Sequence, residues 1–181
     1  VMATEGNLNN EIGAPLTLLR LGPDADYAVV ELGASGLGEI AWTGSLAAPD
    51  VGIITNASEA HLEGFGSLAN IVSAKGEIID SVRAGGTVIL NHDDAAFDDW
   101  RARAGMRRVL SVSAEGRQDA SFRAEAIRED ADGIAFTLLG DAVTATDIRL
   151  PIPGRHNVAN ALLVAAAAHS LGLDMDRVAR G

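Results

Sequence analysis

The sequence feature that most constrains the fold is an alternation of short apolar runs with segments of helical spacing. Nearly continuous apolar runs occupy residues 27–32, 51–56 and 87–91, and the segments 38–46 and 67–83 between them have the spacing of helices. Such runs predict strands that are buried in a parallel sheet. The order strand, helix, strand, helix, strand therefore predicts an α/β fold with a doubly wound, mostly parallel sheet flanked by helices.

The second half of the chain extends this pattern and then departs from it. A helix at about residues 95–104 and a strand at 108–112 are expected to continue the same sheet. Three later strands are separated by the turn-forming pairs Asp132-Gly133 and Gly140-Asp141. These strands, at residues 122–129, 134–139 and 143–150, are expected to form a small antiparallel β appendage.

Two helices are expected near the end of the sequence. An alanine-rich helix runs from about Asn157 to Leu171, and Gly172 stands at the usual position just past its last turn. A further helix starts at Asp174. The whole pattern fits one domain, because 181 residues lie within the usual size range of a single domain.

Composition excludes several functional classes. With 14 Lys+Arg against 25 Asp+Glu, the net charge of −11 would repel a nucleic-acid backbone. The absence of cysteine excludes thiolate catalysis, thiolate zinc sites and disulfides. The longest wholly apolar run, residues 161–168, is far shorter than the roughly 20 residues that cross a bilayer, so no membrane insertion is expected. No signal peptide is visible, and a cytoplasmic location is the default expectation.

Lys75 is the only lysine among the 14 basic residues. In the predicted helix 67–83 it lies four residues after Ile71 and four before Ile79, so it is expected to point toward the core. A buried ammonium is unfavourable unless it is paired or neutralised, and lysine can lose its proton and be chemically modified. The sequence is compatible with a chemical role for Lys75, and also with a side chain that extends its ammonium to solvent past apolar neighbours.

Glu31 and His61 each follow a predicted strand. Ligands of open α/β sheets gather beyond the carboxyl ends of the strands, where both residues are expected to lie. A carboxylate and an imidazole at this edge could hold a divalent cation, whereas either residue alone is more often simply solvated.

The segment from Gly154 to Asn160 opens the alanine-rich helix. Its side chains, including His156, Asn157 and Asn160, and its free backbone N–H groups could face an anion or a purine edge. Plain N-capping by Asn157 is the alternative. The chain contains neither a Gly-x-x-x-x-Gly-Lys-Ser/Thr phosphate loop nor a Gly-x-Ser-x-Gly nucleophile elbow.

Five ordered strings carry a resemblance that covers residues 4–181. They are residues 6–19 (GNLNNEIGAPLTLL), 31–40 (ELGASGLGEI), 60–67 (AHLEGFGS), 74–78 (AKGEI) and 154–160 (GRHNVAN). In this order the strings resemble the Mur ligases of peptidoglycan synthesis. The resemblance implies the central, ATP-binding domain of a three-domain enzyme, without the phosphate loop that precedes it in the family and without the C-terminal domain.

The resemblance also implies roles for individual residues. Glu31 and His61 correspond to magnesium ligands, and Lys75 corresponds to a carbamylated lysine of the same Mg²⁺ site. His156, Asn157 and Asn160 match positions near ATP. Asn9 and Asn10 fall in the stretch that faces the UDP-sugar peptide.

The implied reaction is the ATP-dependent formation of an amide bond. ATP phosphorylates a carboxylate of UDP-N-acetylmuramoyl-tripeptide, and the amino group of D-alanyl-D-alanine displaces the phosphate. A relative of folylpolyglutamate synthase or cyanophycin synthetase is an alternative, although residues 6–19 and 31–40 favour the muramyl ligase. The alternative from another class is a non-catalytic fragment that acts as a binding module.

Overall fold

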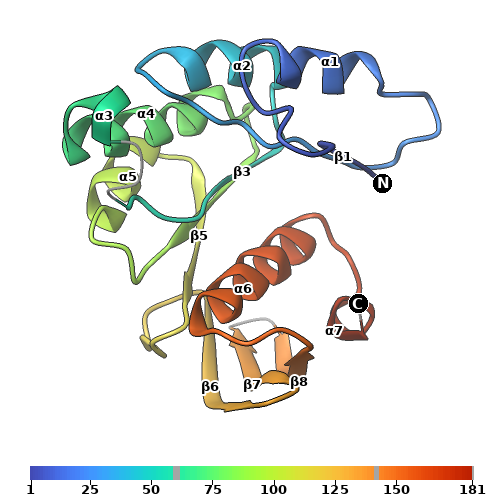
Figure 1. Cartoon of the computed structure of the whole chain (residues 1–181). Helices are drawn as coiled ribbons and strands as arrows, with labels where there is room; N and C mark the ends of the chain where they lie inside the picture. Colours follow the sequence, from blue (N-terminus) through green and yellow to red (C-terminus); the bar gives the residue numbers. More distant parts are fainter. Residues whose placement is uncertain (59–61, 141–142, 181) are drawn as a thin grey trace.

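The protein is described by a computed structural model that covers residues 1–58, 62–140 and 143–180. Its main sheet has the strand order β3-β4-β5-β6-β7-β8 (Figure 1). The strands are β3 Val51–Ile54, β4 Thr87–Asn91, β5 Arg108–Ser113, β6 Phe122–Asp130, β7 Gly133–Gly140 and β8 Val143–Leu150. Strands β3 to β6 pair in parallel and β6 to β8 pair antiparallel, which confirms the predicted fold class.

The antiparallel strands continue the main sheet. Val112 of β5 pairs with Phe122 of β6, and Ser111 and Ser121 exchange hydrogen bonds of 3.1 Å from backbone N–H to hydroxyl. The expected appendage is therefore joined edge to edge with the parallel strands.

Helices cover both faces of this sheet. They are α1 Gly13–Leu19, α2 Glu39–Ala47, α3 Leu62–Phe65, α4 Leu68–Ser81, α5 Phe97–Ala104, α6 Arg155–Ser170 and α7 Met175–Arg180. Side chains of β4 point alternately to the two faces: Val88 and Leu90 pack with α4 and α5, and Ile89 between them packs with α6. The predicted doubly wound arrangement follows from this alternation.

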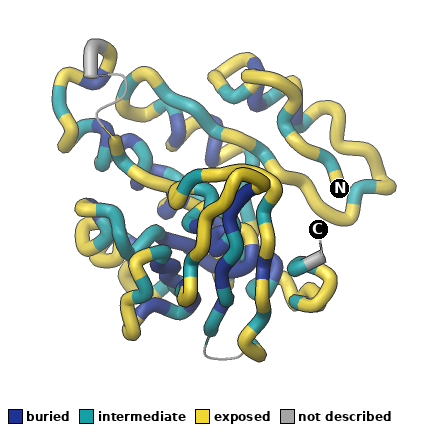
Figure 2. Tube along the Cα trace, turned by 60° about the horizontal axis from the view of Figure 1, so that its bottom comes forward, coloured by how far each residue is buried: buried dark blue, intermediate teal, exposed yellow. Residues whose placement is uncertain are grey.

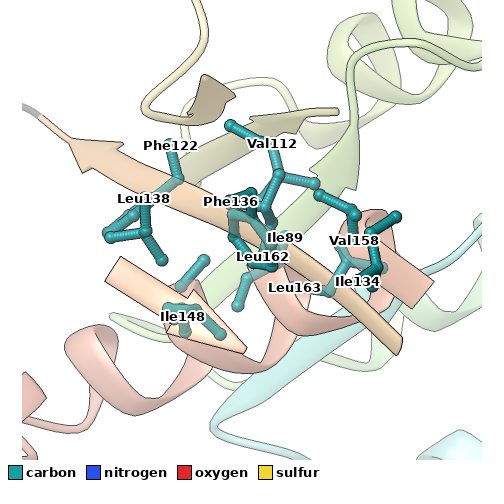
Figure 3. Close-up of a cluster of buried hydrophobic side chains, with 13 residues drawn as sticks. Ile89, Val112, Phe122, Ile134, Phe136, Leu138, Ile148, Val158, Leu162 and Leu163 are labelled. Atoms are coloured by element: carbon teal, nitrogen blue, oxygen red, sulfur yellow. The ribbon is translucent and has the colours of Figure 1, made fainter. Parts of the chain in front are cut away.

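The larger hydrophobic cluster lies between α6 and the sheet (Figure 3). Ile134, Leu138, Val158 and Leu162 are fully buried there. Burying a side chain of this size stabilises the fold by roughly 1.5–3 kcal/mol. Figure 2 shows that the buried segments gather in the strands and in the helix surfaces that face them.

The expectation of a buried strand at residues 27–32 in the main sheet is wrong. Only Ala28–Val29 form a strand, β2, and both residues are exposed. β2 pairs in parallel with β1 (Met2–Ala3) in a separate two-stranded sheet. An apolar run becomes a buried strand only where other elements cover it, and the described part of the chain leaves Val29 62 % exposed.

The two final helices are both present, the first beginning slightly earlier than expected and the second where it was expected. α6 starts at Arg155, two residues before the predicted Asn157, and α7 follows Asp174 directly. Within the described residues, no helix is both long and apolar enough to cross a membrane.

Candidate functional site

Three connecting segments come together on α4 at the carboxyl-end edge of β3 and β4. Ala34, from the segment after β2, and Ala57, from the segment after β3, pack against the buried Ile71 and Ala74 of α4. The third segment follows β4 and contains Asp94, whose carboxylate is hydrogen-bonded to the backbone of Ala57. The carboxyl ends of β3 and β4 bring two of these segments to one place, and packing against α4 brings the segment after β2, from the separate sheet, to the same place.

Lys75 lies on α4 beside these segments and is half-buried. The helix begins at Ser67, whose side chain accepts a hydrogen bond of 3.2 Å from the backbone N–H of Asn70, a regular N-cap. Burial lowers the pKa of the Lys75 ammonium, and the nearby carboxylate of Asp94 acts in the opposite direction. The side chain is less deeply buried than expected, but its environment favours the neutral amine in the predicted direction.

Asp94 is a site residue that the sequence reasoning missed. Its Oδ2 accepts a hydrogen bond of 2.7 Å from the backbone N–H of Ala57, and its Oδ1 accepts one of 2.9 Å from that of Ala96. A cavity of about 320 Å³ opens beside it and is lined by Ala57, Leu68, Ala69, Val72, Asp94, Ala95, Ala96 and Asp99. The available signal was the polar string at the end of β4, from Asn91 to Asp94, since ligands of open α/β sheets gather beyond the carboxyl ends of the strands.

Glu31 and Asn9 form a pair that the sequence did not predict. The Nδ2 of Asn9 donates a hydrogen bond of 2.6 Å to Oε1 of Glu31. The backbone fixes the same contact, because Gly33 N–H donates to the carbonyl of Asn9 at 2.8 Å and Glu31 N–H donates to Oγ1 of Thr4 at 2.9 Å. Glu31 remains exposed, so its carboxylate is oriented and open to a ligand.

Asn10 has a different environment from Asn9. Its Oδ1 accepts hydrogen bonds from the backbone N–H groups of Ile12 at 3.2 Å and Gly13 at 2.8 Å. These bonds stabilise the start of α1. The side chain of Asn10 is thus engaged in local structure.

The expected metal site is only partly visible. His61 lies outside the described residues, and within the described part of the chain no group of three or more His, Asp or Glu side chains could hold a metal ion. Glu31 supplies one hard oxygen donor of the kind that Mg²⁺ prefers. Lys75 fits as a second position only if it is converted to an anion.

The start of α6 forms a separate group on the opposite face of the sheet. The N-cap is Gly154, so the alternative that Asn157 is the N-cap is wrong. Asn157 lies within the first turn, and its Nδ2 donates a hydrogen bond of 2.6 Å to the carbonyl of Pro153. His156 and Asn160 are both exposed. The structure keeps this group apart from Lys75, because α4 and α6 cover different faces.

Comparison with known proteins agrees with this architecture. The family profile described as Mur ligase middle domain matches residues 1–168. The chain belongs to the Mur ligase family. A curated relative, the UDP-N-acetylmuramoyl-tripeptide–D-alanyl-D-alanine ligase of Escherichia coli (strain K12), is 46% identical over 178 residues, which are 98% of this chain and 39% of that protein.

Solved structures show the same relationship for this Mur ligase domain. A crystal structure of MurF from Acinetobacter baumannii has a TM-score of 0.93 at 33% identity and covers 99% of this chain and 38% of that chain. MurF ligase from Thermotoga maritima, solved in complex with ADP, has a TM-score of 0.81 at 26% identity and covers 98% of this chain and 41% of that chain. A mutant FPGS of L. casei, at 17% identity and a TM-score of 0.64, shares the fold alone. The chain thus spans about two fifths of the length of its MurF relatives.

Proposed function

We propose that this chain is the central domain of an ATP-dependent ligase that adds D-alanyl-D-alanine to UDP-N-acetylmuramoyl-tripeptide. The observation that carries the proposal is the placement of the lone Lys75, half-buried and beside Asp94, at the sheet edge to which the segment bearing Glu31 also comes. The names of the MurF relatives supply the substrates. Folylpolyglutamate synthase remains a weaker candidate because only its fold is shared.

The proposed reaction has two steps. The γ-phosphoryl group of ATP is transferred to a substrate carboxylate oxygen, which gives an acyl phosphate and ADP. The amino nitrogen of D-alanyl-D-alanine then attacks the acyl carbon, a C–N bond forms, the C–O bond to phosphate breaks, and the amine loses a proton. Both steps build negative charge on phosphoryl oxygens, so the chain must supply cationic or metal-holding groups near them.

We propose that Glu31, His61 and a carbamate on Lys75 hold Mg²⁺. Bound there, the metal would neutralise charge on the transferring phosphoryl group. Glu31 fits because its carboxylate is exposed and held in orientation by Asn9. Lys75 fits because burial favours the neutral amine, the form that reacts with CO₂. The role of His61 rests on family resemblance.

We further propose that His156, Asn157 and Asn160 contact ATP and that Asn9 and Asn10 lie on the side of the UDP-sugar peptide. The exposed start of α6 supports the first assignment, since free N–H groups and amide side chains suit a nucleotide. The second assignment is supported for Asn9 by its contact with Glu31. Asn10, which is engaged at α1, has weaker support.

The proposed domain organisation places a phosphate loop before Val1 and a C-terminal domain after Gly181. The open edge of the main sheet supports the first part. Among the described residues, β3 is hydrogen-bonded to a neighbouring strand on one side only, Ile53 in its middle is 39 % exposed, and β1 and β2 stand apart as a second sheet. An additional strand beside β3, leading into the phosphate loop, would cover this edge.

The test is a coupled assay of phosphate release on a version of the chain extended to the length of its relatives. We expect release to require ATP, Mg²⁺, UDP-N-acetylmuramoyl-tripeptide and D-alanyl-D-alanine together. Glu31→Ala should shift the magnesium titration to higher concentration more than it changes the KM of either peptide substrate. A binding module would show no turnover with any combination, and a folylpolyglutamate-type ligase would accept a folate and glutamate instead.

A further inference from the structure

Glu77 is a buried carboxylate to which the proposed function assigns no role. It lies on α4, two residues after Lys75, and is only 8 % exposed. Acidic side chains are almost never buried to this degree unless they are paired. Within the described residues no basic side chain forms a salt bridge with Glu77, so its charge must be compensated in another way.

Backbone N–H groups at the start of α2 provide that compensation. The Oε1 of Glu77 accepts a hydrogen bond of 2.7 Å from Gly38 N–H, and its Oε2 accepts one of 2.9 Å from Ala41 N–H. The first N–H groups of a helix have no partner within the helix, and its N-terminus favours a negative charge. Glu77, on the neighbouring helix α4, thus accepts the hydrogen bonds of the backbone N–H groups at the start of α2.

The start of α2 is also the end of the segment that bears Glu31. Gly38 closes this segment in the left-handed region, with φ of 88°, and so directs the chain into the helix. Inside the segment, Ser35 N–H donates a hydrogen bond of 2.9 Å to Oε2 of Glu39, in the first turn of α2. The position of the segment is therefore coupled to the position of the helix start.

Two further contacts hold α2 and the segment against α4. At the far end of the pair, Gly44 approaches Ser81 so closely that a Cβ on the glycine would lie 2.5 Å from the serine Oγ. Near Lys75, Ala34 packs on Ile71 and Ala74. Figure 1 shows α2 running alongside α4. Among the residues of α4 that contact α2 or the segment before it, Glu77 is the one that does so by hydrogen bonds close to Lys75, two residues away.

We propose that Glu77 is a positioning residue that fixes the segment bearing Glu31 against the turn of α4 that carries Lys75. This proposal rests on the proposed function, because it gives the two residues a common ligand. Glu77 itself touches neither substrate nor metal. It acts through the backbone of Gly38 and Ala41.

The substitution Glu77→Gln is the smallest change that tests this role. It preserves the shape of the side chain but replaces one acceptor oxygen with an NH₂ group, which would face a backbone N–H. Asp93→Asn is a matched control. Asp93 Oδ2 likewise accepts two backbone hydrogen bonds, from Ala114 at 2.7 Å and Glu115 at 3.1 Å, but these hold the segment after β5. Its Oδ1 additionally accepts a hydrogen bond from Ser113 Oγ at 2.7 Å and lies 3.3 Å from Arg117 Nε, so this control removes at least as much polar contact as Glu77→Gln.

The first measurement is amide hydrogen exchange on the 181-residue chain. We expect Glu77→Gln to accelerate exchange at Gly38 and Ala41 by about tenfold or more, with little change after β5. Asp93→Asn should show the reverse pattern. Unchanged protection of Gly38 and Ala41 in Glu77→Gln would overturn the proposal at its structural step.

The second measurement is steady-state kinetics on the extended, complete enzyme. A displacement of Glu31 by about 1 Å is expected to lower kcat by roughly 10- to 100-fold and to raise the Mg²⁺ concentration at half-maximal rate, with the KM of ATP nearly unchanged. Asp93→Asn should lower the melting temperature comparably while kcat per folded molecule stays within about threefold of wild type. Equal kcat in both variants would show that Glu77 is only structural and would overturn the proposal.

A second variant keeps the test decisive if Glu77→Gln fails to fold. Glu77→Asp keeps the carboxylate but shortens the side chain by one methylene group, so the bonds from Gly38 and Ala41 cannot both be kept. We expect the same direction of change in kcat and in the magnesium titration. A wild-type complete enzyme without ligase activity would instead overturn the proposed function, and the positioning role of Glu77 in that reaction with it, while the exchange result would stand as a structural finding.

Discussion

Burial has the largest effect on the pKa of the Lys75 ammonium and lowers it, whereas the Asp94 carboxylate raises it. Burial and Asp94 together thus set how much of Lys75 is present as the neutral amine at a given pH. Only the neutral amine attacks CO₂: a C–N bond forms, the nitrogen loses a proton, and the product is an anionic carbamate. A half-buried lysine is suited to this chemistry because the modification replaces an unfavourable cation with an anion able to bind Mg²⁺.

The first prediction concerns stability against pH. The pKa of Lys75 in the folded chain lies below its ordinary 10.5, so between these two values the unfolded chain binds more protons and stability rises with pH. Lys75→Met removes the buried cation. The free energy of unfolding of Lys75→Met should therefore exceed that of wild type most below the lowered pKa, and the difference should narrow as pH approaches 10.5. Urea denaturation of both proteins across this range measures it; a constant difference would contradict the lowered pKa.

The second prediction concerns the carbamate. In the complete enzyme, Lys75→Arg should lower kcat by about 100-fold or more, because a guanidinium retains the positive charge but does not form the adduct. Formate, a small carboxylate, should restore part of the rate of Lys75→Ala by occupying the space of the lost anion, whereas chloride should not. Steady-state rates with each anion provide the measurement. Turnover of Lys75→Arg at the wild-type rate would mean that only the charge is needed.

At the scale of elements, α2 and β3 approach α4 more closely than a side chain allows. A Cβ at Gly44 would lie 2.5 Å from Ser81 Oγ and 2.9 Å from its Cβ, and one at Gly52 would lie 2.6 Å from Cγ2 of Val82. These glycines set the distance between the elements that flank Lys75. The sequence itself does not reveal this, because a glycine that permits close packing looks the same as one that permits a turn.

The third prediction tests this packing. Gly44→Ala should gain about 1 kcal/mol of helix propensity but lose about 1–3 kcal/mol through overpacking against Ser81. The loss from overpacking should exceed the gain in helix propensity, so the variant should be less stable, because the close contact to the Ser81 Cβ persists in every rotamer of the serine. In a double-mutant cycle with Ser81→Gly, chemical denaturation should reveal a favourable coupling, since the second change removes the clash. Additive effects would mean that the helices can separate without loss.

The elements themselves were predictable where local pattern and packing agree. The β4 run is buried on both faces, α4 precedes it and α5 follows it, so periodicity alone located all three elements. The strand expected at residues 27–32 failed because burial depends on partners that an apolar run does not specify. Asp94 and Glu77 were missed for a related reason. Their roles come from hydrogen bonds to backbone groups 36–39 residues away in the chain, and no spacing rule signals such contacts.

At the scale of the whole molecule, the two proposed ligand regions lie on different faces of one sheet. Lys75 belongs to α4 on one face, where the segment bearing Glu31 packs against that helix, and Asn157 and Asn160 belong to α6 on the other. A nucleotide that reaches from one group to the other can pass over the carboxyl-end edge of the sheet, because β8, which leads into α6, runs in the same direction as β3 and β4. We placed the additional strand and phosphate loop beside β3, next to this edge, so nucleotide binding and completion of the sheet are expected to depend on the same proposed segment.

The last prediction is that ATP binding requires the segment proposed to precede Val1. The 181-residue chain has no Gly-x-x-x-x-Gly-Lys-Ser/Thr string, so it lacks the backbone N–H groups and the lysine that hold nucleotide phosphates. We expect isothermal titration calorimetry with ATP and Mg²⁺ to show no binding in the micromolar range for this chain. The chain extended through the segment before Val1 should bind in that range, and its melting temperature should rise with ATP by mass action. Micromolar binding by the 181-residue chain alone would show that α6 and the α4 face suffice, and that the phosphate loop is not required to hold the nucleotide.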